Sequence, residues 1–257
     1  MLGILLSGCG GRLARAVMEF IDTQDDVEIA AGIDPREPDM PFPVYPSAAE
    51  VKERPDVIID CSVPQALPGL LEYALRERVP CVLATTGYGE AEAQMLAGAE
   101  KRIPVFASGN MSLGINLLKE LAKQAARVLG GSFDIEIVEK HHNQKIDAPS
   151  GTAYILAGAV NEGLEAASPR DYQFNRQPLR EKRGKNEIGM HAIRGGTITG
   201  EHTVLFAGFD EVIELSHIAY SKKIFAAGCV NAARYIHGRP AGRYGMEDLV
   251  GTCGVRD

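Results

Sequence analysis

The densest group of ionisable and hydrogen-bonding residues in this chain lies between residues 139 and 153, in the stretch EKHHNQKIDAPSGTA. Two adjacent histidines, His141 and His142, are followed by Lys145 and Asp147. A histidine titrates near neutral pH and a lysine can donate a proton, so this grouping suits acid–base chemistry. No cysteine or third histidine stands nearby in the sequence, which argues against metal ligation, and we expect no metal.

An anion-binding element is predicted directly after these residues. The apolar-alternating run Phe133–Val138 indicates a strand that leads into the stretch, and a helical pattern begins at Thr152. The first turn of a helix offers backbone N–H groups without intrahelical partners and the positive end of the helix dipole. Ser150 is predicted to cap this helix. The stretch therefore predicts an acid–base pair beside a site for a carboxylate or phosphate.

Bulk composition is that of an ordinary globular protein. The 257 residues include 27 Lys+Arg and 34 Asp+Glu, and the resulting net charge of −7 argues against a general nucleic-acid binder. No apolar run approaches the roughly 18–20 residues that span a bilayer. The five cysteines are odd in number and lack a CxxC spacing, so neither a disulfide framework nor a zinc site is indicated. These features predict a reduced, cytoplasmic protein that binds neither nucleic acid nor membrane.

Strand and helix patterns alternate along the first 111 residues. Continuous apolar strands separated by helices predict a doubly wound parallel sheet that is covered on both faces, a Rossmann-type α/β fold. The strands are expected at residues 3–7, 27–33, 56–61, 80–85 and 103–107, and the helices at residues 12–23, 64–78 and 90–101.

The pattern changes after residue 111. A long helix is expected over residues 113–129, and it is followed by strands with a two-residue period. These strands predict a mixed or antiparallel sheet in a second α+β domain, residues 112–221. A final helix over residues 222–237 belongs with the first domain, which we expect to comprise residues 1–111 plus 222–257. The period-two strands are expected at residues 188–194, 197–206 and 211–219, with a loop at residues 169–185 and a Gly/Pro-rich tail at the end.

The turn after the first strand has the spacing Gly8-x-x-Gly11-x-x-Ala14, which is typical of dinucleotide binding. Glycines let the backbone turn and approach a pyrophosphate, and a small Ala14 allows the helix to pack closely on the strand. A purely structural turn is the alternative, and Arg12 could equally lie in solvent. The residues of this turn expected to contact a cofactor are Gly8, Cys9, Gly10, Gly11, Arg12 and Leu13.

Asp34 ends the next strand, where an acidic side chain can accept hydrogen bonds from the adenine ribose. A carboxylate repels the 2′-phosphate of NADPH and therefore favours NADH. Arg36, two residues later, could neutralise that phosphate. The pair leaves both NADH and NADPH open as cofactors.

Two later turns are expected at the carboxyl ends of parallel strands, where ligands bind in such sheets. Their small, hydrogen-bonding residues suit a nicotinamide ring and its ribose. The alternative is that they are ordinary strand-to-helix turns. The first turn contains Ala84, Thr85 and Thr86, and the second contains Ser108, Gly109, Asn110 and Met111.

With these turns and the run Gly200-Glu-His-Thr, the chain closely resembles the dihydrodipicolinate reductase family of bacterial and plant lysine biosynthesis. The stretch from residue 139 matches the family signature E-x-H-H-x-x-K-x-D-A-P-S-G-T-A, and the resemblance covers nearly the whole chain. It implies a Rossmann domain plus a mixed-sheet domain, and a homotetramer assembled through the mixed sheets. It also implies reduction of a small dicarboxylate, 4-hydroxy-tetrahydrodipicolinate, to tetrahydrodipicolinate with NADH or NADPH, in the route to diaminopimelate and lysine.

The resemblance also implies roles for individual residues. His141 is expected to be the proton donor or acceptor and Lys145 the proton donor. His142 is expected to contact the substrate, and Gly151 and Thr152 are expected to hold a substrate carboxylate through backbone and hydroxyl donors. In an extended run the two histidines would point to opposite faces, which agrees with different tasks.

Several neighbouring residues have simpler expected roles. Asp147 is expected to orient Lys145 or cap the turn, and Arg194 is a candidate for lining the substrate pocket. His202 and His217, on predicted strands, are expected to be structural. The chain departs from the family pattern in three places: Ala14 replaces a glycine, Pro35 stands where many members have arginine, and Lys222 replaces an arginine.

Two other functions are compatible with parts of the pattern. An aspartate-semialdehyde-type dehydrogenase would share the Rossmann domain, but its chemistry needs a nucleophilic cysteine and none of the five lies near the His–Lys stretch. A non-catalytic nucleotide-binding protein would bind NAD(H) and would need no paired histidine and lysine at an anion site. Turnover of a dicarboxylate distinguishes these functions from a reductase.

Overall fold

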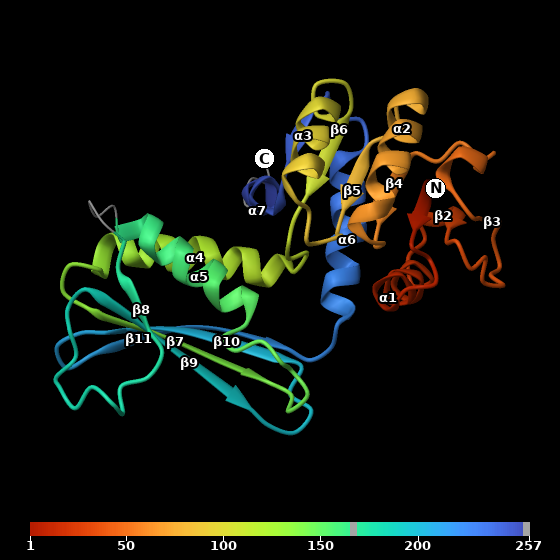
Figure 1. Ribbon diagram of the computed structural model, residues 1–257. Coiled ribbons are helices and arrows are strands. Elements are labelled where there is room, and N and C mark those ends of the chain that lie inside the picture. The colour runs from red at the N-terminus through yellow and green to blue at the C-terminus, as the bar shows by residue number, and fades with distance from the viewer. Residues whose placement is uncertain (165–168, 254–257) are drawn as a thin grey trace. The chain divides into compact units, whose positions relative to one another are not determined.

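The structure, a computed structural model, describes residues 1–164 and 169–253 (Figure 1). The chain divides into two compact units. The first unit comprises residues 1–113 together with the chain from residue 222 onward, and the second comprises residues 114–221. The chain therefore passes from the first unit to the second after residue 113, whereas the boundary predicted from the sequence follows residue 111.

A seven-stranded sheet forms the centre of the first unit, in the order β12-β6-β5-β4-β1-β2-β3. Every neighbouring pair is parallel, and the order reverses direction at β1, so the predicted doubly wound Rossmann-type sheet is confirmed. Its strands are β1 (Leu2–Ser7), β2 (Val27–Ile33), β3 (Val44–Tyr45), β4 (Val57–Asp60), β5 (Cys81–Leu83), β6 (Pro104–Ala107) and β12 (Gly242–Tyr244).

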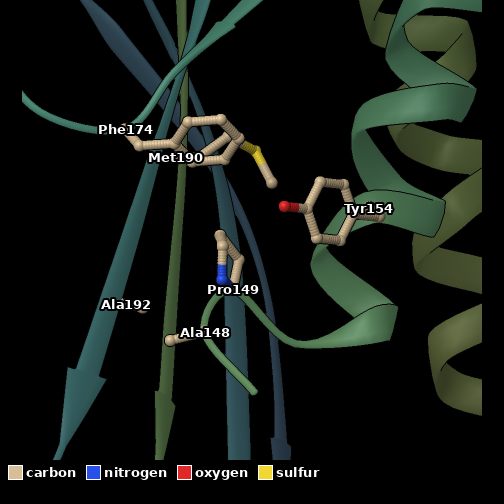
Figure 2. Close-up of a pocket in the computed structure, with 6 residues that line it drawn as sticks. All are labelled: Ala148, Pro149, Tyr154, Phe174, Met190 and Ala192. Carbon is tan, nitrogen blue, oxygen red and sulfur yellow. The ribbon is translucent and has the colours of Figure 1, made fainter.

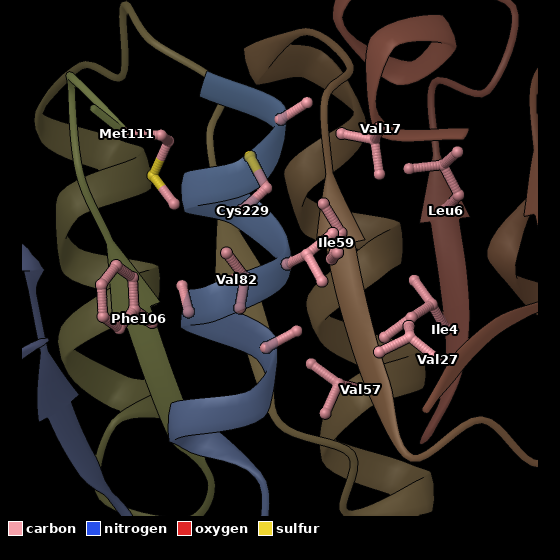
Figure 3. Packing of buried hydrophobic residues seen from close by; sticks show 14 of the residues in the cluster. Ile4, Leu6, Val17, Val27, Val57, Ile59, Val82, Phe106, Met111 and Cys229 are labelled. Atoms are coloured by element: carbon pink, nitrogen blue, oxygen red, sulfur yellow. The ribbon is translucent and has the colours of Figure 1, made fainter. Parts of the chain in front are cut away.

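Helices cover both faces of this sheet, because its strands are apolar on both sides. One face packs against α1 (Arg12–Ile21), α6 (Lys223–Ile236) and α7 (Met246–Cys253), and Figure 3 shows Cys229 of α6 directed toward the strands. The other face packs against α2 (Leu67–Glu77) and α3 (Glu90–Ala99). Each fully buried large side chain, such as Phe106, contributes about 1.5–3 kcal/mol. Two short 3₁₀ helices, Ala48–Glu50 and Pro64–Ala66, precede β4 and α2.

A five-stranded mixed sheet in the order β11-β10-β7-β9-β8 forms the second unit, as predicted. Strand β10 pairs antiparallel with β7 and β11, whereas β9 pairs parallel with β7 and β8. Helices α4 (Leu113–Leu129) and α5 (Gly151–Leu164) lie over one face of the sheet, here called the covered face, and the opposite face is called the open face (Figure 1). The strands are β7 (Asp134–His141), β8 (Asp171–Gln173), β9 (Glu187–Arg194), β10 (Gly200–Ala207) and β11 (Val212–Ala219).

Sequence patterns missed the short elements. The predicted loop over residues 169–185 contains β8, and the predicted tail contains β12 and α7. Strands β8 and β12 are three-residue edge strands, and β3 has two residues, so none is long enough for a periodic pattern to develop. The end of that tail, residues 254–257, lies outside the described residues. Within the described part of the chain, no helix has the length and apolar character needed to cross a membrane.

Candidate active site

The glycine turn between β1 and α1 lies against the turn that follows β4. Gly8 has a φ of +73°, in the left-handed region that favours glycine. A Cβ at this position would lie 2.8 Å from the Ser62 Cα and 2.9 Å from the carbonyl oxygen of Cys61. Both neighbours are backbone atoms, so they cannot rotate away. The N–H of Gly11 donates to the Gly8 carbonyl at 2.9 Å, and α1 begins at the next residue.

A cavity of about 320 Å³ opens beside this turn at the carboxyl ends of β1, β2 and β4. Its lining includes Gly8, Ile33, Pro35, Ser62 and Val63. The cavity brings the predicted glycine turn and the end of the second strand together, as a dinucleotide site requires. Ser62 and Val63 were not predicted, although they follow the predicted strand over residues 56–61 at the same edge of the sheet.

Asp34 lies directly after β2 and is 3% exposed. Arg36 donates to both carboxylate oxygens, from Nε at 3.0 Å and from Nη2 at 3.1 Å, and the N–H of Gly10 donates at 3.0 Å. The hydrogen bonds from Arg36 outweigh burial and lower the pKa of Asp34 to about 2. Asp34 is therefore ionised at neutral pH, and its charge is neutralised by an arginine whose side chain is 73% exposed.

The two later turns lie together at the carboxyl ends of β5 and β6. Both contribute to one cavity of about 310 Å³, which also contacts Arg243 of β12 and Tyr88. Asp60, a buried carboxylate at the end of β4, accepts from the Thr85 hydroxyl at 2.6 Å and so fixes the first turn. The predicted residues that line this cavity are Thr85, Thr86, Ser108 and Gly109.

The remaining residues predicted to contact a cofactor differ in exposure. The side chains of Cys9 and Met111 are buried in the hydrophobic core between the sheet and helices α1 and α6, so only their backbone atoms can face a ligand. Arg12 is exposed in the first turn of α1. Leu13, Ala84 and Asn110 are partly buried and do not line the two cavities.

In the second unit, strand periodicity places polar residues where core residues are expected. Along β7, Ile135 and Ile137 face the covered side, and the two-residue period puts Glu139 and His141 on that same side. Both are buried, at 0% and 9% exposure. The predicted strand ended at Val138, so the structure extends it as far as His141.

Neighbouring strands complete a polar cluster around these two residues. In the sheet register His141 lies beside Arg194 of β9, and Glu139 lies beside His202 of β10. The rings of His141 and His202 meet edge to face, with centroids 5.1 Å apart. Gly200 gives the His141 ring room, because a Cβ there would lie 3.1 Å from Nε2. Glu139 and Gly200 belong to the motifs that resemble the family, but neither was assigned a role from the sequence, although the alternation of β7 points to the former.

Burial lowers the pKa of His141, and the carboxylate of Glu139, 2.5 Å from Nδ1, opposes that effect. The positive charges of Lys145 and Arg194 lower the pKa further. The neutral form of His141 is therefore favoured more than in a solvated histidine.

The loop after β7 holds the other predicted residues. The Lys145 ammonium lies 2.8 Å from the Asp147 carboxylate, so Asp147 does contact the lysine that it was expected to orient. The backbone N–H of Lys145 donates to the His142 carbonyl at 3.2 Å. His142 is half-buried, and the N–H of Asn143 bonds the Gly196 carbonyl at 3.2 Å.

The start of α5 follows this loop. The Ser150 hydroxyl accepts from the N–H of Ala153 at 3.2 Å, which confirms Ser150 as the helix cap. His202 Nε2 lies 2.9 Å from the same hydroxyl, and burial lowers the pKa of His202 to about 4. His202 thus holds the helix start as a neutral ring. Gly151 is exposed at the first helical position, and Thr152 is half-buried beside it.

A separate cavity of about 440 Å³ lies beside the Ala148–Pro149 segment (Figure 2). It is lined by residues of β9, α5 and the segment after β8, and Figure 2 shows the Tyr154 ring directed across it toward β9. Because no lining residue carries a charge, this cavity does not suit a dicarboxylate. Its lining is Ala148, Pro149, Tyr154, Phe174, Met190 and Ala192.

Comparison with known proteins agrees with the geometry of both units. The family described as "Dihydrodipicolinate reductase, N-terminus" matches residues 2–111, and "Dihydrodipicolinate reductase, C-terminus" matches residues 114–250. The 4-hydroxy-tetrahydrodipicolinate reductase of Caldanaerobacter subterraneus subsp. tengcongensis is 48% identical over 250 residues, which cover 97% of this chain and 98% of that protein. The enzyme of the same name from Clostridium tetani is 41% identical over 253 residues, with 98% of each chain covered.

A solved structure gives the same fold. The dipicolinate-bound dihydrodipicolinate reductase of Paenisporosarcina sp. TG-14 superposes with a TM-score of 0.81 over 97% of this chain and 99% of that chain, at 23% identity. The two family matches together span both units of the fold, and the relatives are similar over nearly their whole length. The chain therefore belongs to the dihydrodipicolinate reductase family, a family of oxidoreductases whose N-terminal unit is a nucleotide-binding domain.

Proposed function

We propose that this protein reduces 4-hydroxy-tetrahydrodipicolinate to tetrahydrodipicolinate with NADH or NADPH, in the pathway to diaminopimelate and lysine. The observation that carries the proposal is the cluster at the end of β7. This cluster contains the buried His141, the loop after β7 that carries Lys145 (the lysine loop), and the capped start of α5. The other unit has a glycine turn in which a Cβ at Gly8 would meet backbone atoms.

The chemistry of the reaction matches this cluster. Replacing the substrate hydroxyl by hydrogen requires a hydride and a proton, and the hydroxyl leaves as water. The hydride is supplied by the nicotinamide of the cofactor when it is bound. We assign the proton transfer to His141 and Lys145, and the contact with the ring substrate to His142. Gly151 and Thr152, at the positive end of α5, are assigned to one substrate carboxylate.

The cofactor is assigned to the glycine turn and the two later turns of the first unit. The Gly8 and Gly11 backbone suits the pyrophosphate, and Asp34 suits the adenine ribose. Thr85 and Ser108 line the second cavity, which suits the nicotinamide half. Because Asp34 is already neutralised by Arg36, we expect the protein to accept both NADH and NADPH.

A coupled assay tests the proposal. Purified protein is mixed with either cofactor and with substrate generated by dihydrodipicolinate synthase, and nicotinamide absorbance is followed. Substrate-dependent oxidation is expected with at least one cofactor. If neither is oxidised while NADH still binds, the chain is a nucleotide-binding protein without this activity, and the proposal fails.

Removing Arg36 is expected to affect NADPH far more than NADH. In Arg36→Ala the 2′-phosphate would lose its counter-charge and meet the bare Asp34 carboxylate. A hydrogen bond to a charged group contributes roughly 1.5–3 kcal/mol, so kcat/KM for NADPH should fall by about 10–100-fold. Michaelis parameters for both cofactors measure the effect. Arg76→Ala, which removes an exposed arginine paired with Glu77 at 2.7 Å, should change neither. An equal loss of kcat/KM with both cofactors would show that Arg36 does not bind the 2′-phosphate of NADPH.

We also propose that the protein is a homotetramer assembled through the open face of the second unit. Ile193 and Ile218 on this face are 46% and 51% exposed. In the sheet register the ion pair of Lys140 and Glu201 lies between them, and Val138 and Leu205 lie on the same face in neighbouring rows. Exposed apolar residues gathered on one sheet face favour association with another protein surface. A second copy of the same sheet would bury them.

Charges placed on this face are expected to break the assembly. We expect light scattering to give the tetramer mass for the wild-type protein and a lower mass for Ile193→Asp/Ile218→Asp. Val128→Asp alters a side chain of α4 that is 80% exposed, and it should leave the mass unchanged. A tetramer mass for the double variant would place the interface elsewhere.

A further inference from the structure

The second unit contains a buried carboxylate for which the proposed proton transfers have no direct use. Glu139 is 0% exposed on the covered face of β7. Its Oε2 lies 2.5 Å from His141 Nδ1 and accepts from Arg194 Nη1 at 2.8 Å. Its Oε1 accepts from the Ser150 N–H at 3.0 Å and from Arg194 Nη2 at 2.7 Å. A carboxylate offers about four acceptor positions, so these contacts satisfy it.

Arg194 extends this network into the lysine loop. Besides its hydrogen bonds to Glu139, Arg194 donates from Nη2 to the Asp147 carbonyl at 2.6 Å. Asp147 in turn lies 2.8 Å from the Lys145 ammonium. The Glu139–Arg194 pair therefore touches the end of β7, the lysine loop and the start of α5. These are the three segments that carry the residues we assign to protons and to the substrate.

The contact with Glu139 also determines which nitrogen of His141 carries the proton. Burial raises the pKa of Glu139, but hydrogen bonds from Arg194 and His141 outweigh burial and leave that pKa below its usual value. The carboxylate is therefore ionised and can only accept, so Nδ1 of the neutral ring must be the protonated nitrogen. Nε2, which faces Gly200, is then the atom that can gain or lose a proton.

We infer that Glu139 and Arg194 are positioning residues, which hold His141 in the Nδ1–H tautomer and fix the lysine loop and the helix start relative to it. This inference rests on the proposed role of His141. It adds a requirement to that role, because the ring can exchange protons at Nε2 only if Nδ1 is occupied. A carboxylate that fixes a histidine tautomer in this way is a recurrent device in enzymes.

The two residues should act on His141 in opposite directions. The charged or titratable groups that face its ring are Glu139 on the same strand, Arg194 of β9, Lys145 of the loop and His202 of β10. Glu139 raises the pKa of His141, whereas Lys145 and Arg194 lower it. Glu139→Gln should therefore lower the pKa of His141, and Arg194→Gln should raise it. Loss of packing alone would not produce shifts of opposite sign.

The first test does not depend on the catalytic activity of any variant. Nitrogen-15 NMR of histidine-labelled wild-type protein distinguishes the two neutral tautomers, and the His141 signals are identified by their loss in His141→Asn. We expect the Nδ1–H form in the wild-type protein. Finding the Nε2–H form would overturn the inference whether or not the protein turns over substrate.

The second test is a pH titration of the variants. The limb of the kcat/KM profile that belongs to His141, and its NMR titration, should move to lower pH in Glu139→Gln and to higher pH in Arg194→Gln. Turnover of Glu139→Gln should fall by about 10²–10⁴-fold, the range for a disabled acid–base group. If Glu139→Gln does not fold, Arg194→Gln still tests the direction of the shift in the pKa of His141.

Glu136→Gln is the matched control. Glu136 lies on the same strand, on the open face, and it also contacts an arginine and a histidine, Arg183 at 2.8 Å and His191 at 2.8 Å. Its replacement should leave the titration and tautomer of His141 unchanged. Shifts of the same sign in Glu139→Gln and Arg194→Gln, or none, would overturn the inference. If the NMR results hold but no variant or wild-type protein turns over the substrate, the proposed function fails and the positioning remains.

Discussion

Replacing Lys145 by alanine is expected to lower kcat by about 10²–10⁴-fold, the usual contribution of a positioned general acid. The lysine lies 2.8 Å from Asp147, in a loop tied to Glu139 through Arg194. Its loss removes both a proton donor and a positive charge beside His141. The affinity for NADH should be nearly unchanged, because the nucleotide is assigned to the other unit. Single-turnover kinetics and a fluorescence titration with NADH measure the two quantities separately.

Lys123→Ala provides the comparison for this variant. Lys123 is also a lysine of the second unit paired with a carboxylate, Glu162, at 2.8 Å, but this pair joins α4 to α5 and its side chains are 31% and 59% exposed. Its replacement should leave kcat within about two-fold, because an exposed ion pair contributes little. If Lys145→Ala retained the wild-type kcat, the lysine would have no part in the mechanism.

Replacing Gly8 by alanine is expected to disable the nucleotide-binding unit. A non-glycine residue in the left-handed region costs roughly 1–2 kcal/mol, and the overpacked contact adds about 1–3 kcal/mol. The new Cβ would meet backbone atoms of Cys61 and Ser62, so the turns after β1 and β4 must separate. We expect NADH and NADPH affinity to fall by about 10²-fold or more. The melting temperature should fall by about 5–10 °C.

Gly98→Ala tests whether these losses are specific to the turn. Gly98 lies within α3, has no atom within 4 Å of its missing Cβ, and takes no part in either cavity. Alanine there should leave cofactor affinity unchanged and the melting temperature equal or slightly higher, because alanine is the better helix former. Calorimetry and NADH titration of both variants give the comparison. Wild-type affinity in Gly8→Ala would mean that the cofactor does not depend on this turn.

The long elements of both units were predicted well because their signals are local. Strand β2 has the predicted bounds, Val27–Ile33, and α4 has the predicted bounds, Leu113–Leu129. In both, apolar spacing over several turns or pleats indicates the element directly. Strand β12, by contrast, has three residues, Gly242–Tyr244, and exists because it pairs with β6, which lies far away in the sequence. No local pattern contains that pairing.

The active-site residues also divide into those with local sequence signals and those brought together by long-range pairing. The histidine pair, Lys145 and the Ser150 cap are contiguous in sequence, so their residue types suggested acid–base chemistry and an anion site. Arg194, which grips Glu139 with two hydrogen bonds, is 55 residues away from it. The two meet only because β7 and β9 pair in parallel, with His141 beside Arg194. Such a register depends on the whole sheet, and the sequence suggested Arg194 only as a candidate for lining the substrate pocket.

The discontinuity of the first unit has a consequence for synthesis on the ribosome. Its core cluster combines Leu6 and Ile59, from the first strands made, with Cys229 and Val230 of α6, which are made after the second unit (Figure 3). At roughly 5–20 residues per second, the intervening segment of about 100 residues takes about 5–20 s to translate. During that interval one apolar face of the nascent sheet lacks α6. The contiguous second unit can finish folding first, so the nucleotide-binding unit that begins the chain is the last to be completed.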